Sequence, residues 1–214
     1  KLWFSTYDNG VFAKPELFDE SINFSNYQPH GTFSKDGKTF IFSARDKNGK
    51  GELDLYQSIL GADSKWSEAT LLDDIINTDK NEDSPFLSED GNTLYFASKG
   101  HEGFGAYDIF KSQKENGKWT KPMNLGFPIN SSADDIYLSI NKEENKGYLS
   151  SNRVGGKGAM DIYYLQDYTK PTFDCKPYPN EPFTVNFDLS NSVDPKSHAV
   201  DYKWNFENGI IKYG

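Results

Sequence analysis

The sequence predicts an all-β chain whose first 166 residues form consecutive four-stranded, antiparallel blades of a partial β-propeller. Three similar segments recur: SARDKNGKGELDLYQS at 43–58, ASKGHEGFGAYDIFKS at 97–112 and SSNRVGGKGAMDIYYL at 150–165. One aspartate and one glycine keep a spacing of 54 and then 53 residues in these segments: Asp54, Asp108, Asp161, Gly51, Gly105 and Gly158. A repeat of about 40 to 55 residues built from short strands is typical of a propeller blade.

Each repeat predicts four strands, a to d, in the same order. Strand b is the apolar segment before the Gly-rich loop, at 39–44, 93–98 and 147–151. The pairs Asp36-Gly37 and Asp90-Gly91 precede two of these strands and predict a–b hairpin turns, because glycine accepts a positive φ. Strand c begins at the repeated aspartate and is followed by strand d, which is predicted in the segments VFAKPELF (11–18), WSEATLLD (66–73) and WTKPMNLG (119–126).

Aromatic residues lead the three predicted d strands. We expect them to pack between neighbouring blades: Phe12, Trp66 and Trp119. An Ile-Asn pair closes each of these segments before the crossing to the next blade: Ile22-Asn23, Ile76-Asn77 and Ile129-Asn130. Together these anchors predict one repeated frame with variable loops.

The register predicts where the blades begin and end. The segment KLWFS at 1–5 aligns with strand c, and no Trp-led strand d follows 161–166, so we expect an open arc with exposed strand edges from a longer protein. A linker with three prolines is expected at 167–179. Residues 180–214 alternate apolar and polar side chains and predict an incomplete immunoglobulin-like β-sandwich with Trp204 in its core.

Composition narrows the classes of function. Aromatic residues make up 15% of the chain, and no long run has helical spacing, which suits packed sheets joined by tight turns. A formal net charge of −9 argues against nucleic acid or an anionic lipid surface as the partner. No apolar stretch approaches the length of a transmembrane helix, so we expect a chain that does not span a membrane.

Motifs for chemistry are sparse, and we expect a noncatalytic chain without cofactor or metal. The only cysteine is Cys175, and an incidental thiol is favoured over a catalytic pairing with His198. The sequence contains neither a G-x-S-x-G segment nor histidine pairs at zinc-ligand spacing. Two roles are open for Asp54, Asp108 and Asp161. Their carboxylates could bind a cation or act as an acid, or each could have a structural role and accept hydrogen bonds from the backbone N–H groups of its Gly-rich loop. Recurrence in every copy favours the structural role.

The b–c loops and the d–a crossings are expected at the same end of the blades. There the sequence places mixed charges and an aromatic residue: Arg45, Lys99, His101, Phe104 and Arg153. Acidic pairs fall beside them: Asp19-Glu20, Asp73-Asp74, Glu82-Asp83 and Asp134-Asp135. This mixture favours a protein-binding face, with a solvated face or a calcium site as alternatives.

Two segments carry a family resemblance. The stretch SPFLSEDGNTLYFASKGHEGFGAYDIFKS, followed by WTKPMNLGFPIN, resembles the TolB-type, WD40-like propeller repeat of Gram-negative envelope proteins, and the resemblance covers residues 1–166. The first copy departs from the pattern with RDKNGKG, and the third lacks the proline at strand a. The tail, with VNFDLSNSVDP and YKWNFENG, resembles the first half of a PKD domain, from which Asn205 and Glu207 depart.

These resemblances imply a location and a role. Proteins that combine such modules are often periplasmic or outer-membrane-associated proteins of the Bacteroidota, some with an OmpA-like peptidoglycan-binding domain and some serving type IX secretion. The resemblance therefore implies a scaffold that binds one or more envelope proteins, with peptidoglycan reached through a domain outside this chain. The alternatives are an extracellular glycan-binding or carbohydrate-active protein, and the regulatory propeller of a peptidase.

Overall fold

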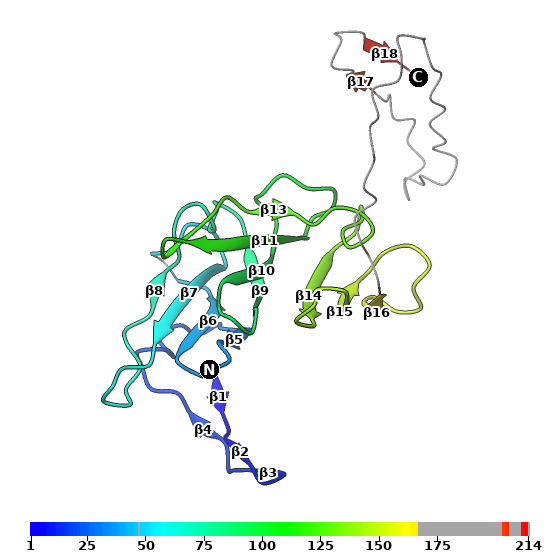
Figure 1. The fold of residues 1–214 in the computed structure, drawn as a ribbon. Helices are drawn as coiled ribbons and strands as arrows, with labels where there is room; N and C mark the ends of the chain where they lie inside the picture. The colour runs from blue at the N-terminus through cyan, green and yellow to red at the C-terminus, as the bar shows by residue number, and fades with distance from the viewer. Residues whose placement is uncertain (47, 167–202, 206–210, 214) are drawn as a thin grey trace. The chain divides into compact units, whose positions relative to one another are not determined.

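The structure, a computed structural model, describes residues 1–46, 48–166, 203–205 and 211–213 (Figure 1). The chain divides into two compact units, Lys1–Pro171 and Thr172–Gly214. In the second unit, the described backbone forms the antiparallel pair β17 (Lys203–Asn205) and β18 (Ile211–Tyr213). The linker at 167–179, Cys175, His198 and the Trp204 side chain lie outside the described residues, so the predictions on them stay predictions.

All elements in the described part of the chain are strands, which confirms the all-β prediction. Blade 1 contains β1 (Trp3–Phe4), β2 (Tyr7–Asp8), β3 (Val11–Phe12) and β4 (Glu16–Leu17). Blade 2 contains β5 (Gly31–Phe33), β6 (Thr39–Ala44), β7 (Asp54–Ile59) and β8 (Thr70–Leu71). Blade 3 contains β9 (Glu82–Leu87), β10 (Thr93–Ser98), β11 (Asp108–Glu115), β12 (Lys118–Trp119) and β13 (Met123–Asn124). Blade 4 contains β14 (Asp135–Ile140), β15 (Lys146–Ser151) and β16 (Asp161–Gln166).

Strand pairing follows the predicted order in every blade. Blade 2 is an antiparallel sheet with the order β5-β6-β7-β8, and blades 3 and 4 begin in the same way. Strand c occupies the same register against strand b throughout, with the pairs Tyr56↔Phe42, Phe110↔Phe96 and Tyr163↔Leu149. Strands c and d are the ones present in blade 1, where Trp3 faces Leu17 as Tyr56 faces Leu71 in blade 2. The repeat alignment is therefore confirmed.

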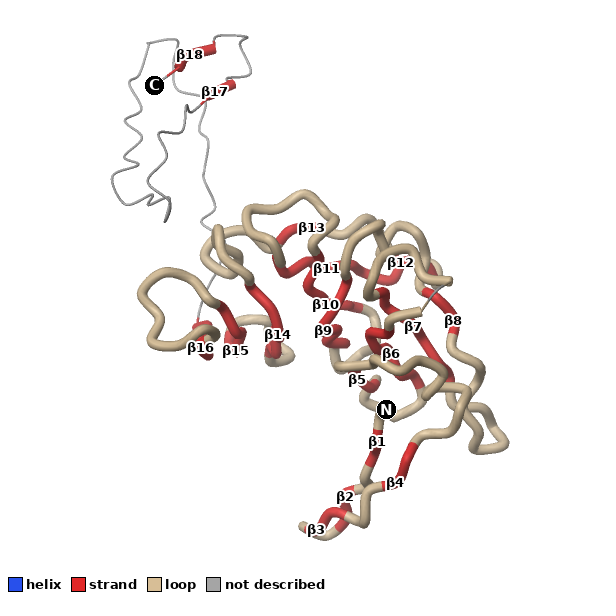
Figure 2. The backbone as a smooth tube through the Cα atoms, turned by 180° about the vertical axis from the view of Figure 1, so that it is seen from behind, coloured by secondary structure: helices blue, strands red, loops and turns tan. Residues whose placement is uncertain are grey.

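The innermost strands of blades 2, 3 and 4 are β5, β9 and β14, which follow one another in both views of the fold (Figures 1 and 2). The a–b turns lie at one end of these strands. Gly37 and Gly91 have φ values of +68° and +71° there, as the Asp-Gly signal predicts. The carboxylates of Asp36 and Asp90 each accept a serine hydroxyl and a backbone N–H, which closes the turn.

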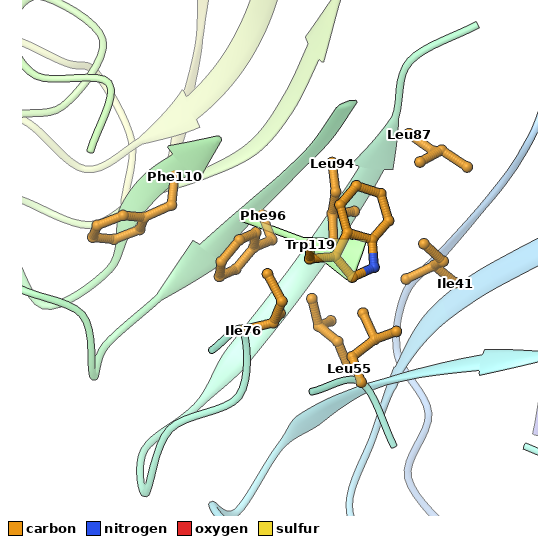
Figure 3. Packing of buried hydrophobic residues seen from close by; sticks show 9 residues of the cluster. Ile41, Leu55, Ile76, Leu87, Leu94, Phe96, Phe110 and Trp119 are labelled. Carbon is orange, nitrogen blue, oxygen red and sulfur yellow. The ribbon is translucent and has the colours of Figure 1, made fainter. Parts of the chain in front are cut away.

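Apolar cores fill the spaces between consecutive blades. Between blades 2 and 3, Trp119 is 7% exposed and lies among the side chains of Ile41, Leu55 and Phe96 (Figure 3). Trp66 is partly buried in the same way against the core between blades 1 and 2. The prediction that Phe12 is also a core residue is wrong, because its side chain is 70% exposed. Trp66 and Trp119 face the preceding blade, and the described residues contain no blade that precedes Phe12.

Candidate functional site

One end of the blades carries the b–c loops and the d–a crossings, and we call it the loop face. The b–c loops are 45–53, 99–107 and 152–160, and the crossings are 18–30, 72–81 and 125–134. The opposite end, the turn face, carries the a–b turns. Alternate connections of antiparallel strands lie at opposite ends of a sheet, so the strand order itself places these loops together.

The repeated aspartates hold the b–c loops. Each carboxylate Oδ2 accepts two backbone N–H groups of its own loop: Lys50 and Gly51 to Asp54 (3.0 and 3.2 Å), Phe104 and Gly105 to Asp108 (2.7 and 3.0 Å), and Lys157 and Gly158 to Asp161 (2.7 and 3.0 Å). Burial raises the pKa of the Asp54 and Asp108 carboxyls, and these N–H donors oppose the rise. The geometry is that of a structural anchor, with the Oδ2 atom of each carboxylate directed at backbone N–H groups.

Glycines allow the loop to wrap closely around its aspartate. A Cβ atom on Gly103 would lie 2.0 Å from Asp108 Oδ2, a separation that no side chain can occupy. A Cβ atom on Gly105 would lie 1.9 Å from the carbonyl oxygen of Ala133 in the next crossing. The b–c loop is therefore clamped between its own blade and the following crossing.

A second hydrogen bond recurs in each crossing. The carbonyl oxygen of the isoleucine in the Ile-Asn pair accepts it from a side chain, and the type of this side chain differs from copy to copy. The contacts are Gln28 Nε2 to Ile22 O (2.5 Å), His101 Nε2 to Ile76 O (2.9 Å) and Arg153 Nη2 to Ile129 O (2.5 Å). Burial lowers the pKa of His101, so the neutral imidazole that donates to this carbonyl is favoured. His101 and Arg153 thus serve the frame of the loop face.

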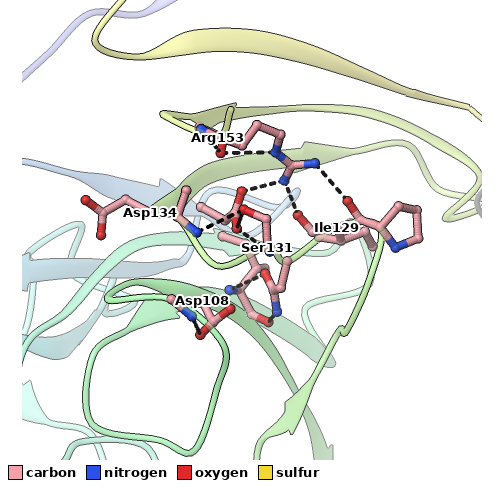
Figure 4. Close-up of polar contacts among 12 residues, drawn as sticks. Asp108, Ile129, Ser131, Asp134 and Arg153 are labelled. Carbon is pink, nitrogen blue, oxygen red and sulfur yellow. Dashed lines mark hydrogen bonds and ion pairs between the residues drawn. The ribbon is translucent and has the colours of Figure 1, made fainter. Parts of the chain in front are cut away.

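Arg153 organises a buried network at the junction of blades 3 and 4 (Figure 4). Its guanidinium donates to Pro128 O (2.9 Å) and Ser151 Oγ (3.1 Å) and forms an ion pair with Asp135. The Asp135 side chain has no exposed surface, and that of Arg153 is 19% exposed. Asp135 also accepts the N–H and hydroxyl of Ser131, at 2.6 and 2.8 Å. The binding role predicted for Arg153 stays a prediction, and the described donors of its guanidinium are directed at the protein itself.

Two of the acidic residues predicted in or beside the crossings are buried. Asp135 and Glu82 are the first residues of β14 and β9, at equivalent positions of the repeat. Glu82 accepts the N–H and hydroxyl of Thr78, both at 2.8 Å, and the hydroxyl of Ser98 at 2.7 Å. Burial raises its pKa, and the hydrogen-bond partners described for it, Thr78 and Ser98, carry no charge.

Three residues predicted for the loop face present exposed side chains. Phe104 is 63% exposed at the tip of its b–c loop, and Arg45 and Lys99 are also exposed. The Arg45 Cζ atom lies 5.3 Å from the centroid of the Tyr27 ring, and the Lys99 Nζ atom lies 4.4 Å from that of Tyr107. Cations on tyrosine rings are partly ordered before a partner arrives, which lowers the entropy lost on binding.

Sequence reasoning missed a cluster at the beginning of the inner strands, at the edge of the loop face. His30, Ser84 and Tyr137 occupy the same repeat position in three consecutive blades, and Asp83 joins two of them. The Asp83 Oδ1 atom accepts His30 Nδ1 at 2.8 Å, Ser43 Oγ at 2.6 Å and Ser84 N at 2.7 Å. The rings of His30 and Tyr137 lie 4.7 Å apart in an edge-on arrangement.

The backbone of this cluster is unusual. Ser84 and Tyr137 have φ values of +44° and +56°, and the register of β9 and β14 shifts beside them. Positive φ in residues other than glycine is uncommon and gathers at functional sites. The signal available in the sequence was the repeat offset. It aligns three chemically different residues at one position, whereas the structural positions of the repeat carry the same residue in each copy.

A crevice of about 720 Å³ opens on the turn face, between the ends of β5, β9 and β14. Apolar side chains line its floor: Phe33, Phe86, Leu87, Tyr95 and Ile140. Lys35 on its rim forms an ion pair with Glu89 at 2.7 Å and lowers the pKa of that carboxyl, to which Lys142 adds a smaller effect. These three rim residues share one repeat position, so the turns alternate in charge from blade to blade.

Within the described ranges, no group of three or more His, Cys, Asp or Glu side chains is placed to hold a metal ion. The same part of the chain contains no helix long and apolar enough to cross a membrane. No protein-family model matches the chain, and no curated protein matches its sequence.

Solved structures with a similar arrangement of strands include two TolB proteins. TolB from Acinetobacter baumannii is 17% identical over 65% of this chain and 30% of its own, with a TM-score of 0.45. A putative TolB from Agrobacterium tumefaciens is 15% identical over 77% of this chain and 56% of its own, with a TM-score of 0.49.

The periplasmic gluconolactonase PpgL of Pseudomonas aeruginosa is also similar, at 12% identity over 64% of this chain and 38% of its own, with a TM-score of 0.39. The chain spans between 30% and 56% of the length of these three proteins. The assignment of blades rests on the strand pairing and register of this chain.

Proposed function

We propose that the chain is a noncatalytic protein-interaction module of the periplasm or outer membrane of a Gram-negative bacterium, and that its loop face binds the partner. The partner is one or more envelope proteins. The resemblance to TolB-type repeats and to the PKD domain supports this location. It also supports a place in a secretion or envelope complex that is linked to peptidoglycan through domains outside this chain.

One observation carries the proposal: the loop face combines a repeated frame with side chains that change from copy to copy. The aspartate–loop hydrogen bonds and the hydrogen bonds to the isoleucine carbonyl oxygens recur in the repeats. The exposed side chains of this face, which include Arg45, Lys99 and Phe104, do not recur. Variable side chains on a rigid frame are where binding specificity is built, because they change without disturbing the core. Exposed aromatic and arginine side chains are frequent anchors of protein interfaces.

The test replaces these three residues together by alanine in the purified chain. Arg153 is left intact because it holds the frame. We expect an unchanged melting temperature and a loss of roughly tenfold or more in affinity for the envelope protein that the chain captures. The matched control, on the opposite side of the blades, replaces the exposed Lys38 and Lys118 by alanine and should bind as the wild type does. Equal loss in both variants would contradict the proposed face.

The crevice on the turn face favours a second candidate function, glycan binding. Phe33 is 42% exposed, and one side of its ring is covered by Phe40, with ring centroids 4.4 Å apart. Its ring also lies near Phe18 and Trp66, and its exposed part offers an aromatic surface beside the polar rim of the crevice. Calorimetric titration with a panel of neutral oligosaccharides tests this candidate. Binding that Phe33→Ala abolishes and the loop-face variant leaves intact would support it.

A further inference from the structure

The cluster at the beginning of the inner strands contains polar side chains that the repeat does not require. Three of them meet at the junction of blades 2 and 3: His30, Ser43 and Asp83. The repeat offset gives their equivalents at the junction of blades 3 and 4: Ser84, Ala97 and Ile136. Alanine and isoleucine side chains form no hydrogen bonds, yet the inner strands pair in the same order in both blades. The three polar side chains are therefore not part of the common blade frame.

The hydrogen bonds of Asp83 fix the orientation and the tautomer of the His30 ring. The Asp83 Oδ1 atom accepts His30 Nδ1 at 2.8 Å, together with the Ser43 hydroxyl and the Ser84 backbone N–H. A carboxylate oxygen only accepts, so Nδ1 carries the proton of the neutral ring and Nε2 keeps a lone pair. The His30 side chain is 32% exposed, and the described residues provide no donor to its Nε2 atom.

Both members of this dyad come from blades with a described blade on either side. Blade 2 packs on blades 1 and 3, and blade 3 packs on blades 2 and 4. Tyr137 of blade 4 completes the cluster, with its ring centroid 4.7 Å from that of His30 and its backbone N–H 3.4 Å from Ser84 Oγ. Burial raises the pKa of the Tyr137 hydroxyl, and the carboxylate of Asp83 adds to this rise. The phenol therefore stays neutral beside the dyad.

The dyad carries one negative charge when the imidazole is neutral. In the described part of the chain, His30 is the only group at ion-pair distance from Asp83. Two cations of the loop face are engaged elsewhere, because Arg45 lies on the Tyr27 ring and Lys99 on the Tyr107 ring. A negative charge behind an exposed lone pair favours a ligand that is cationic and donates hydrogen bonds, since a charge-assisted bond is about twice as strong as a neutral one. An ammonium group meets both conditions.

We infer that this cluster binds the ammonium group of a lysine side chain on the partner protein. His30 Nε2 accepts one N–H of the ammonium, Asp83 balances its charge from behind the imidazole, and the Tyr137 ring offers a cation–π contact. A lysine fits because its compact charge sits at the end of a long, flexible stem. The net charge of −9 favours the approach of such a basic segment. The inference rests on the proposed function, to which it adds the chemistry of the partner.

Nuclear magnetic resonance of the imidazole nitrogens tests the site without the partner. The chain contains three histidines, so nitrogen-15 labelling of histidine gives three rings, and the spectrum of His30→Asn assigns the ring of His30. In mildly alkaline buffer we expect this ring to carry its proton on Nδ1. The probe is Nα-acetyl-lysine methylamide, and its Nε-acetylated form, which has no ammonium group, is the control probe. The His30 Nε2 resonance should shift and saturate with the first probe and stay in place with the second.

Two variants separate the charge of the dyad from the general charge of the loop face. Asp83→Asn keeps an oxygen that can accept His30 Nδ1 and removes the charge, so it should weaken the probe roughly tenfold. Asp79→Asn is the matched control, because it removes one carboxylate from a crossing of the same face, where the side chain is 83% exposed. It should bind the probe as the wild type does. Circular dichroism verifies the folding of each variant.

A third variant connects the site to the partner. His30→Asn keeps an N–H donor close to the place of Nδ1 and has no atom at the place of Nε2. It should weaken capture of the envelope protein roughly tenfold, and the probe should no longer shift the ring protons of Tyr137. This second readout replaces the Asp83→Asn titration if that variant does not fold.

Several results would overturn the inference. A His30 ring that carries its proton on Nε2, or a resonance that does not move up to the solubility of the probe, would exclude the ammonium site. Equal weakening of the probe by Asp83→Asn and Asp79→Asn would exclude a role of the dyad. Probe binding with unchanged capture by His30→Asn would assign the site to a free amine instead of a lysine of the partner. The variant of Arg45, Lys99 and Phe104 tests the proposed function separately, so the two failures are distinguishable.

Discussion

Replacing Arg153 by methionine tests the buried network at the junction of blades 3 and 4. Methionine keeps much of the length of the side chain and removes the guanidinium. The change leaves the Asp135 carboxylate, which has no exposed surface, without its cation, and it removes the donors from Pro128 O and Ile129 O. Breaking a buried pair by removing one partner costs about 3 to 5 kcal/mol. In a chain of this size, that cost lowers the melting temperature by about 6 to 20 °C.

The chain provides a matched control, because Arg45 is the one other arginine. Its side chain is 59% exposed, and its nearest carboxylate, that of Glu52, lies 3.9 Å away. Arg45→Met should therefore change the free energy of unfolding by no more than about 0.5 kcal/mol. Urea unfolding of both variants, followed by circular dichroism, measures the difference. If the two variants differ from the wild type by the same amount, the network does not stabilise the junction and the reasoning is refuted.

Two further predictions concern the other carboxylates of the frame. Asp108→Ala should lower stability by about 1 to 3 kcal/mol, because the hydrogen bonds to Phe104 N and Gly105 N are lost; an unchanged melting temperature would count against the anchor role. The raised pKa of Glu82 means that its contribution to stability is present below the unfolded-state pKa and is lost as the pH rises through the folded-state pKa. The glutamine of Glu82→Gln cannot ionise, so this variant should unfold at a higher urea concentration than the wild type at neutral pH. The difference should disappear near pH 4.5, the ordinary pKa of glutamate. A difference in urea midpoint that does not depend on pH would argue against burial as the cause of the raised pKa.

The blade frame could be predicted from sequence because local signals and long-range repetition agree. The Asp-Gly pairs fix the a–b turns, and the offset of 54 and 53 residues fixes which positions share an environment. Strand pairing in the structure follows this offset at every c strand. The hydrogen bonds of Asp54, Asp108 and Asp161 followed from the same logic, since a residue that recurs beside a tight loop is placed to close it.

The roles of single loop residues could not be predicted in the same way. Arg153 and His101 looked like exposed charges, and the contact that buries them lies in a crossing about 25 residues earlier in the chain. Glu82 and Asp135 looked like loop acids because sequence patterns place strand ends only within a few residues. Phe12 followed the repeat pattern, but its burial depends on a neighbouring blade rather than on its own strand.

Photo-crosslinking in the native envelope is the measurement that tests the binding face most directly. A photoreactive phenylalanine analogue is placed at Phe104 on the loop face or at Lys118 on the opposite side of blade 3, and both variants are expressed at wild-type levels. We predict that illumination joins the Phe104 variant to one defined envelope protein and leaves the Lys118 variant without that adduct. An adduct from position 118 together with none from position 104 would contradict a loop face that binds the partner.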